Sequence, residues 1–63
     1  MSAQVTRALR ERAAFLAGDG DRLEALAGTM TGDDMRETDR DAGQRRWLAR
    51  EFTKLADACE REP

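Results

Sequence analysis

The residues with the most reactive side chains are Cys59 and two carboxylates that are neighbours in the sequence, Asp33 and Asp34. A cysteine nucleophile needs a base to form its thiolate, and the sequence has no histidine, so only a carboxylate or Lys54 could serve. Two neighbouring carboxylates can divide the roles of acid and base inside a dry cleft, but 63 residues are too few to build one. We therefore predict that the protein is not an enzyme, and we interpret Cys59 as a buried, inert thiol.

Metal and cofactor chemistry is equally hard to place in this sequence. One cysteine and no histidine cannot supply the thiolate and imidazole ligands of a zinc site. The stretch from Gly18 to Asp21 has two carboxylates, but an EF-hand also needs a central glycine and a glutamate at its twelfth position, and neither follows. We therefore predict no metal, no cofactor and no small-molecule substrate, and we interpret residues 18–21 as a turn.

Trp47 is the residue that says most about binding. It lies about 140° around a helix from the centre of the strongest apolar stripe in the chain. That stripe is formed by Leu48, Phe52, Leu55 and Cys59, at spacings of four, three and four, with Ala49 and Ala56 beside them. A tryptophan that faces water is costly and is typical of binding hot spots. The alternative is that a neighbouring helix or loop covers it, with Met30 or Met35 against its ring.

Charge is distributed unevenly along the chain. Residues 18–41 contain eight acids and three arginines, a net charge of −5, whereas residues 1–17 and 42–54 have net charges of +2 and +3. The favoured interpretation is that basic and acidic stretches pair within a helical hairpin or bundle, where each exposed pair contributes about 0–1 kcal/mol. The alternative is that the acidic segment 33–41 docks on a basic partner surface.

A basic ridge on the last predicted helix is the one feature that could contact nucleic acid. Arg46, Arg50 and Lys54 follow one another at intervals of four, and such a ridge can bind phosphates. A helix-turn-helix within residues 23–41 is disfavoured, because the acids of its second helix would face phosphates that repel them. An ordinary solvated face is the simplest interpretation of the ridge.

The composition indicates a helical protein with too small a core. Of the 25 hydrophobic residues 11 are alanine, and leucine, isoleucine, valine and phenylalanine together number nine of 63. That share is below the roughly 20 % at which chains usually fold alone. The net charge of only −2 argues against a disordered chain. We therefore expect a folded protein that completes its core against a second chain.

Glycines divide the chain into three predicted helices. These span residues 3–17, 21–30 and 33–60. Gly18 stands where a helix-ending residue belongs, and Ser2 is a candidate cap at the start. Asp21 with Glu24 has the spacing of a capping box for the second helix. Thr31 precedes an acid-rich first turn, which predicts the start of the third.

The third predicted helix is uneven along its length. Residues 33–46 carry no apolar stripe, whereas the stretch from Asp41 to Arg61 contains the strongest one. We therefore predict a break or a weak helix near residues 38–43. The alternative is a continuous solvated arm supported by ion pairs along the helix.

The predicted fold class is all-α. We expect one small domain over residues 1–63, a bundle of two or three helices with the first antiparallel to the last, completed by dimerisation or by a partner. Residues near the N-terminus lack the apolar core of a signal peptide, and no apolar run approaches the roughly 20 residues of a membrane span, so the expected compartment is the cytoplasm. The excess of arginine over lysine, ten to one, is typical of a GC-rich bacterial or phage genome.

The predicted function is non-catalytic binding of another protein, as an inhibitor, adaptor, chaperone or regulatory subunit, or self-association as a homodimer. The alternative is a small nucleic-acid-binding regulator that uses the basic ridge, although nucleic acid is the less favoured partner. The predicted partner-binding residues are Trp47, Arg46, Arg50, Glu51, Asp33, Asp34 and Glu37.

Overall fold

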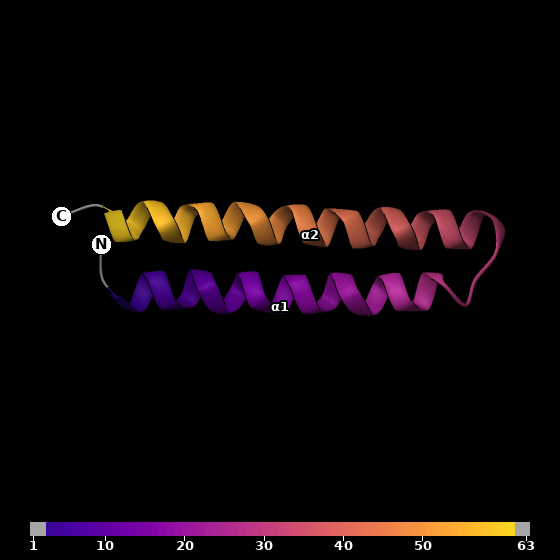
Figure 1. Cartoon of the computed structure of the whole chain (residues 1–63), viewed down its shortest axis with the longest axis horizontal. Helices are drawn as coiled ribbons and strands as arrows, with labels where there is room; N and C mark the ends of the chain where they lie inside the picture. Colours follow the sequence, from indigo (N-terminus) through magenta and orange to yellow (C-terminus); the bar gives the residue numbers. More distant parts are fainter. Residues whose placement is uncertain (1–2, 62–63) are drawn as a thin grey trace.

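Two antiparallel helices make up the structure, a computed structural model that describes residues 3–61. Helix α1 spans Ala3–Ala27 and helix α2 spans Gly32–Arg61. They lie side by side, with the start of α1 and the end of α2 at one end of the rod and the connection at the other (Figure 1). The rod measures 50 × 12 × 10 Å. The predicted all-α class is confirmed, and residues 3–61 contain no strand.

Helix α1 continues through the stretch for which the sequence predicts a turn. Gly18 does not end the helix, and Gly20 lies buried against α2. A Cβ added to Gly20 would lie 3.0 Å from Cγ of Arg46 and 3.2 Å from the carbonyl oxygen of Ala42. This close approach offsets the roughly 1 kcal/mol that a glycine costs inside a helix. The prediction of separate helices at 3–17 and 21–30 is therefore wrong.

Helix α2 is also continuous, so the predicted break near residues 38–43 is wrong. The inner side of this stretch is held against the connection and α1. The Thr38 hydroxyl donates to Sδ of Met30 at 3.3 Å, and Ala42 is buried. A Cβ added to Gly43, the residue that suggests a break, would have no atom within 4 Å, so this glycine weakens the helix without ending it.

The connection between the helices lies where the sequence has two glycines, Gly28 and Gly32. Helix α1 ends at Ala27, and Thr29 folds back through its backbone N–H and its hydroxyl, which donate to the carbonyl of Leu26 at 3.0 and 2.7 Å. Gly32 opens α2 with a φ of 66°, a conformation that favours glycine. Thr31 stands immediately before α2, as predicted, whereas the candidate cap Ser2 lies outside the described residues.

The seam between the helices repeats every seven residues, the period of a coiled coil. In α1 the line of small residues is Thr6, Ala13, Gly20 and Ala27, and three positions further along lie Leu9, Leu16 and Leu23. In α2 the line of small residues is Ala42, Ala49 and Ala56. The second line of α2 is Thr38, Arg45, Phe52 and Cys59. All of these residues are buried or half-buried. The small residues let the two backbones approach closely.

The register of the seam follows from the contact at Gly20. A Cβ there would lie 3.5 Å from Cβ of Arg45, so these two residues face each other. Stepping along both helices in opposite directions places Leu16 level with Ala49, and Ala13 level with Phe52. Each layer thus combines a small with a larger side chain, and no large side chain of residues 3–61 is fully buried. The hairpin has a thin core.

The apolar stripe predicted for the last helix is rotated from the true seam. Cys59 is buried, as predicted, and Phe52 is half-buried, but Leu55 is 54 % exposed. The centre of the buried face runs through Ala49 and Ala56, which the larger leucines flank. The alanines occupy the centre because only small side chains fit where the backbones lie closest.

Candidate functional site

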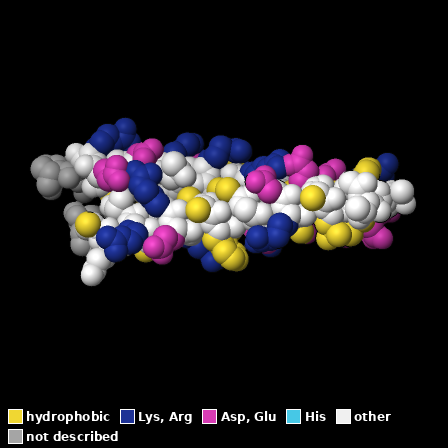
Figure 2. Space-filling view, turned by 60° about the horizontal axis from the view of Figure 1, so that its bottom comes forward, with side chains coloured by type: hydrophobic (Ala, Val, Ile, Leu, Met, Phe, Trp, Pro, Cys, Tyr) yellow, Lys and Arg dark blue, Asp and Glu magenta, His cyan; other side chains and the backbone are white. Residues whose placement is uncertain are grey.

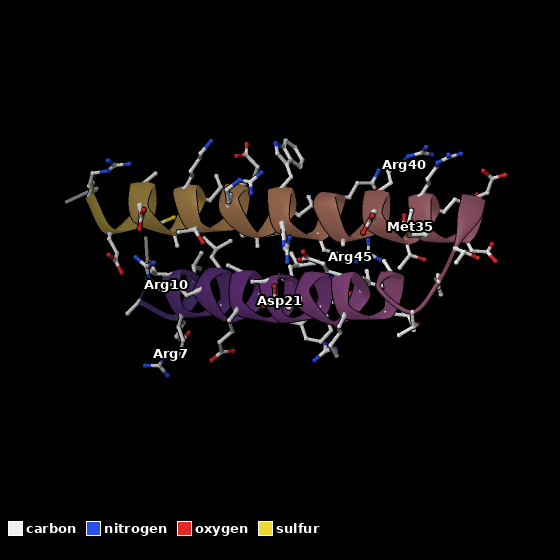
Figure 3. The ribbon with its side chains drawn as sticks, turned by 45° about the vertical axis from the view of Figure 1, so that its right-hand side comes forward. Arg7, Arg10, Asp21, Met35, Arg40 and Arg45 are labelled. Carbon is white, nitrogen blue, oxygen red and sulfur yellow. The ribbon has the colours of Figure 1, made fainter. Side chains whose placement is uncertain are left out.

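The outer face of α2, opposite the seam, carries cations around a single aromatic ring. Its members are Arg36, Arg40, Trp47, Arg50, Lys54 and Arg61, and all of them are exposed. They recur at spacings of four, seven, three, four and seven, which keeps them on one side of an α-helix. Figure 3 shows Arg40 pointing away from α1, whereas Arg45 points toward it. We name this set the outer ridge.

Trp47 is exposed on the outer ridge. It keeps 54 % of its surface accessible, so the alternative of an enclosing helix does not hold within residues 3–61. Helical side chains lean over the turn that precedes them, and the residue one turn before Trp47 is Gly43, which has no side chain. One side of the indole ring therefore stays open to a partner.

The residues predicted to bind together with Trp47 differ in their ion pairs. Arg50 is exposed and forms no ion pair within residues 3–61, and Glu51 pairs with Lys54 at 2.9 Å on the same helix. Arg46 instead turns toward α1 and binds Asp21, at 3.0 Å, and Glu24. Arg46 still lines one groove together with Arg50 and Lys54, so the three predicted cations lie along one side of α2, although Arg46 is held by acids of α1.

The predicted acidic binding residues form a separate surface. Asp33, Asp34 and Glu37 are exposed in the first turns of α2, and Asp33 pairs with Arg36 at 3.2 Å. Thirteen residues separate Asp34 from Trp47, about 20 Å along the helix. The acidic residues and Trp47 therefore occupy different parts of the α2 surface.

Ion pairs bridge the two helices along one flank, which we call the paired flank. Arg10 of α1 binds Asp57 and Glu60 of α2 at 3.0 and 2.8 Å, and Glu24 of α1 binds Arg46. The hydrogen bonds to Glu60 and then to Asp57 raise the pKa of Arg10. Alanines floor a shallow groove between these bridges. Its lining includes Ala13, Ala14, Ala17 and Ala49.

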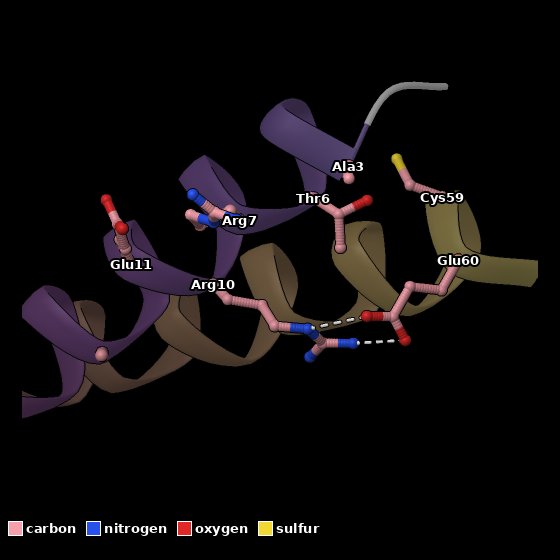
Figure 4. A pocket seen from close by; sticks show the side chains of 8 residues that line it. Ala3, Thr6, Arg7, Arg10, Glu11, Cys59 and Glu60 are labelled. Atoms are coloured by element: carbon pink, nitrogen blue, oxygen red, sulfur yellow. Dashed lines mark hydrogen bonds and ion pairs between the residues drawn. The ribbon is translucent and has the colours of Figure 1, made fainter.

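The paired flank continues to the end of the rod as a second shallow groove (Figure 4). It is lined by Ala3, Thr6, Arg7, Arg10, Glu11, Ala14, Cys59 and Glu60. The Arg10 side chain reaches across it to Glu60, and the buried Cys59 lies at its edge.

The opposite side of the hairpin, which we call the open flank, exposes apolar surface. Val5, Leu26 and Leu55 are 42, 48 and 54 % exposed, and each stands one residue before a member of the small-residue seam lines. The Asp19–Arg45 pair, at 3.1 Å, crosses this flank near its middle. Hydrophobic side chains reach the surface between charged ones along much of the rod (Figure 2). Sequence reasoning missed the apolar part of this flank, although the seven-residue spacing of the small seam residues signals it.

Neither a metal site nor a membrane-spanning helix is found in the described part of the chain. No three histidine, cysteine, aspartate or glutamate side chains among residues 3–61 are grouped so that they could hold a metal ion. Neither helix, over the same residues, is long and apolar enough to cross a membrane. Comparison with family models, with curated proteins and with solved structures finds no match for this chain.

Proposed function

We propose that this chain is a non-catalytic protein-binding protein and that its partner docks on the outer ridge of α2. The observation that carries the proposal is the exposure of Trp47, which stays 54 % accessible although the chain has few large apolar residues. Exposing an indole ring costs free energy that a buried position would recover. Tryptophan and arginine are the side chains most enriched at binding hot spots.

The chemistry around Trp47 defines the partner surface. An apolar pocket would take the indole ring, and carboxylates around that pocket would meet Arg50 and Arg40, which form no ion pair within residues 3–61. Hot spots of this kind have an apolar anchor surrounded by polar contacts that exclude water. The protein would act by occupying such a pocket, as an inhibitor, adaptor, chaperone or regulatory subunit does.

Nucleic acid is the second candidate, because the outer ridge presents five cations over about 37 Å of helix. Its members could follow a phosphate backbone. Against this, Glu37 and Glu51 border the ridge, and the first turn of α2 adds Asp33 and Asp34. Phosphate contacts weaken steeply with salt, whereas an interface centred on an indole ring does not.

The test places a photoreactive phenylalanine derivative at position 47 and, as the control, at position 25. Ala25 lies on the outer side of α1 and is also exposed. We expect position 47 alone to form a covalent adduct with one defined polypeptide when the tagged chain is irradiated in its source cells. Adducts with nucleic acid at position 47 would favour the second candidate, and equal adducts at both positions would overturn the proposal.

Substitution of Trp47 by alanine then measures the contribution of the ring to binding. With the cross-linked partner purified, we expect Trp47→Ala to weaken binding by about 2–4 kcal/mol in titration calorimetry. Circular dichroism should show unchanged helicity, because the side chain contributes little to the seam. Unfolding of the free variant would instead show that Trp47 belongs to the core, and the proposal would lose its support.

A further inference from the structure

We propose that a second copy of this chain packs on the open flank in an antiparallel orientation, giving a four-helix bundle with twofold symmetry. The proposal concerns a different surface from the outer ridge and does not depend on the proposed function. It rests on the order of side chains along the flank, on the exposure of its apolar members and on the thin core of the hairpin.

The line of α1 on the open flank has a pattern that is complementary to itself. It reads Val5, Arg12, Asp19 and Leu26 at intervals of seven. Residues seven apart return to nearly the same side of a helix. The order is apolar, positive, negative, apolar, so an antiparallel second α1 places Val5 against Leu26 and Arg12 against Asp19. The twofold axis repeats both contacts, and every member of the line finds a suitable partner.

Other arrangements of two α1 helices bring like charges together. A parallel copy in register places Arg12 against Arg12 and Asp19 against Asp19. Sliding the antiparallel copy by seven residues in either direction produces one of the same two contacts. Like charges facing each other in an interface are strongly unfavourable. Of these arrangements, only the antiparallel register that sets Val5 against Leu26 avoids like-charge contacts and also pairs all four members of the line.

Packing α1 against α2 of the second copy is also unfavourable. The register set by Gly20 and Arg45 brings the α1 line level with the leucines of α2. A parallel second copy keeps this register, which puts Leu55 and Leu48 within two positions of the level of Arg12 and Asp19, on the same flank. Both charges would then lose water without gaining a partner, a cost that apolar contacts do not offset.

The antiparallel register also covers apolar side chains near the symmetry axis. The axis passes level with Phe15 and Leu16, so the two copies of Phe15 lie beside each other. Phe15 is 55 % exposed in the single hairpin, and the Arg12 guanidinium lies 5.4 Å from the centre of its ring. On α2 the same level brings together the two copies of Leu48, which is only half-buried within one chain. The dimer thus supplies part of the missing core.

Overall charge favours the same orientation. Residues 16–49, the half of the rod that contains the turn, carry eight acids and five arginines. The other half has six basic and five acidic residues. An antiparallel copy brings the acidic half of each chain alongside the weakly basic half of the other, whereas a parallel copy brings the two acidic halves together. The outer ridge with Trp47 stays outside the bundle.

Disulfide cross-linking tests both the dimer and its orientation. In a chain with Cys59→Ala, Val5→Cys and Leu26→Cys lie about 32 Å apart on one helix and cannot bond within a molecule. We expect the double variant to form a disulfide-linked dimer on mild oxidation, because a disulfide needs Cα atoms within about 7 Å. Val5→Cys alone, Leu26→Cys alone and Ala25→Cys, the outer-face control, should stay monomeric on a non-reducing gel.

Charge reversal tests the register. Each of the two variants, Arg12→Glu and Asp19→Lys, changes both symmetric contacts of the dimer. We expect each contact to raise the dimer dissociation constant at least tenfold, so that each variant raises it about 100-fold. Sedimentation equilibrium measures this constant. An equimolar mixture should recover the dimer, because the glutamate introduced at position 12 of one chain then faces the lysine introduced at position 19 of the other. Circular dichroism confirms that each variant is folded, and Trp47→Ala should leave the mass unchanged, which separates this test from that of the outer ridge.

Three results would overturn the proposal. The first is a fully helical wild-type chain that remains monomeric at the highest soluble concentration. The second is cross-linking by Val5→Cys alone, which would indicate a parallel dimer. The third is a mixture of the two charge variants that associates no better than either variant by itself. The cross-linking result decides the matter if a charge variant fails to fold.

Discussion

Two glycines, one in the seam and one on the outer face of α2, show how differently the two regions of this hairpin are built. Gly20 lies where α2 comes so close that a Cβ would meet Ala42 and Arg46 at 3.2 and 3.0 Å. Gly43 has nothing within 4 Å of the same added atom. Both glycines lower the stability of their helix by a similar amount, because glycine has a low helix propensity. In the seam that cost allows close packing, whereas on the outer face it leaves the surface beside Trp47 open.

The largest effect is expected where the seam is tightest. Gly20→Leu would force the helices apart, because the Ala42 carbonyl is backbone and cannot move aside. We expect the free energy of unfolding to fall by about 2–3 kcal/mol and the thermal midpoint by roughly 10 °C or more. Urea and thermal unfolding followed by circular dichroism measure both quantities.

Gly18→Leu is the matched control for that substitution. Gly18 lies two residues away in the same helix, but a Cβ added there meets nothing within 4 Å. The control should stabilise the chain by a few tenths to about 1 kcal/mol through helix propensity alone. Equal destabilisation by both substitutions would mean that the close approach at Gly20 does not hold in solution.

The glycines of α1 also explain where the sequence misled. The local sequence from Gly18 to Asp21 favours a turn. A contact with residues more than twenty positions away favours a continuous helix instead. Asp21 and Glu24, predicted to cap a helix, instead bind Arg46 across the seam. Helix propensity describes neighbours in sequence, so it could not show that α2 would stabilise a continuous α1.

The features that were predicted correctly depend on short-range patterns. The start of α2 after Thr31 and the burial of Cys59 follow from capping residues and helical periodicity. Trp47 faces away from the seam for the same reason. Arg46, Arg50 and Lys54 line one groove, but spacings of four alone could not show that Arg46 would pair with acids of α1.

An intermediate effect is expected at the edge of the seam. Arg46→Ala removes the ion pairs to Asp21 and Glu24, which are exposed enough that salt weakens them. We expect a loss of about 1 kcal/mol in the free energy of unfolding at low salt, shrinking as ionic strength rises. Arg50→Ala on the outer ridge is the control and should change stability by less than about 0.5 kcal/mol. Equal losses from both would show that the paired flank does not hold the helices together.

The smallest effect is expected at Gly43. A gain in stability there, against the loss expected at Gly20, would distinguish the outer face from the seam. Gly43→Ala adds a methyl group that meets nothing within 4 Å among residues 3–61 beyond its own stretch of helix, so helix propensity should decide the outcome. We expect a gain of about 0.5–1 kcal/mol and a rise in the thermal midpoint of a few degrees. A loss of stability would mean that another chain already packs on the outer face beside Trp47 in solution. That face could not then be free for the proposed partner, whereas a gain together with weaker partner binding would place the partner directly over Gly43.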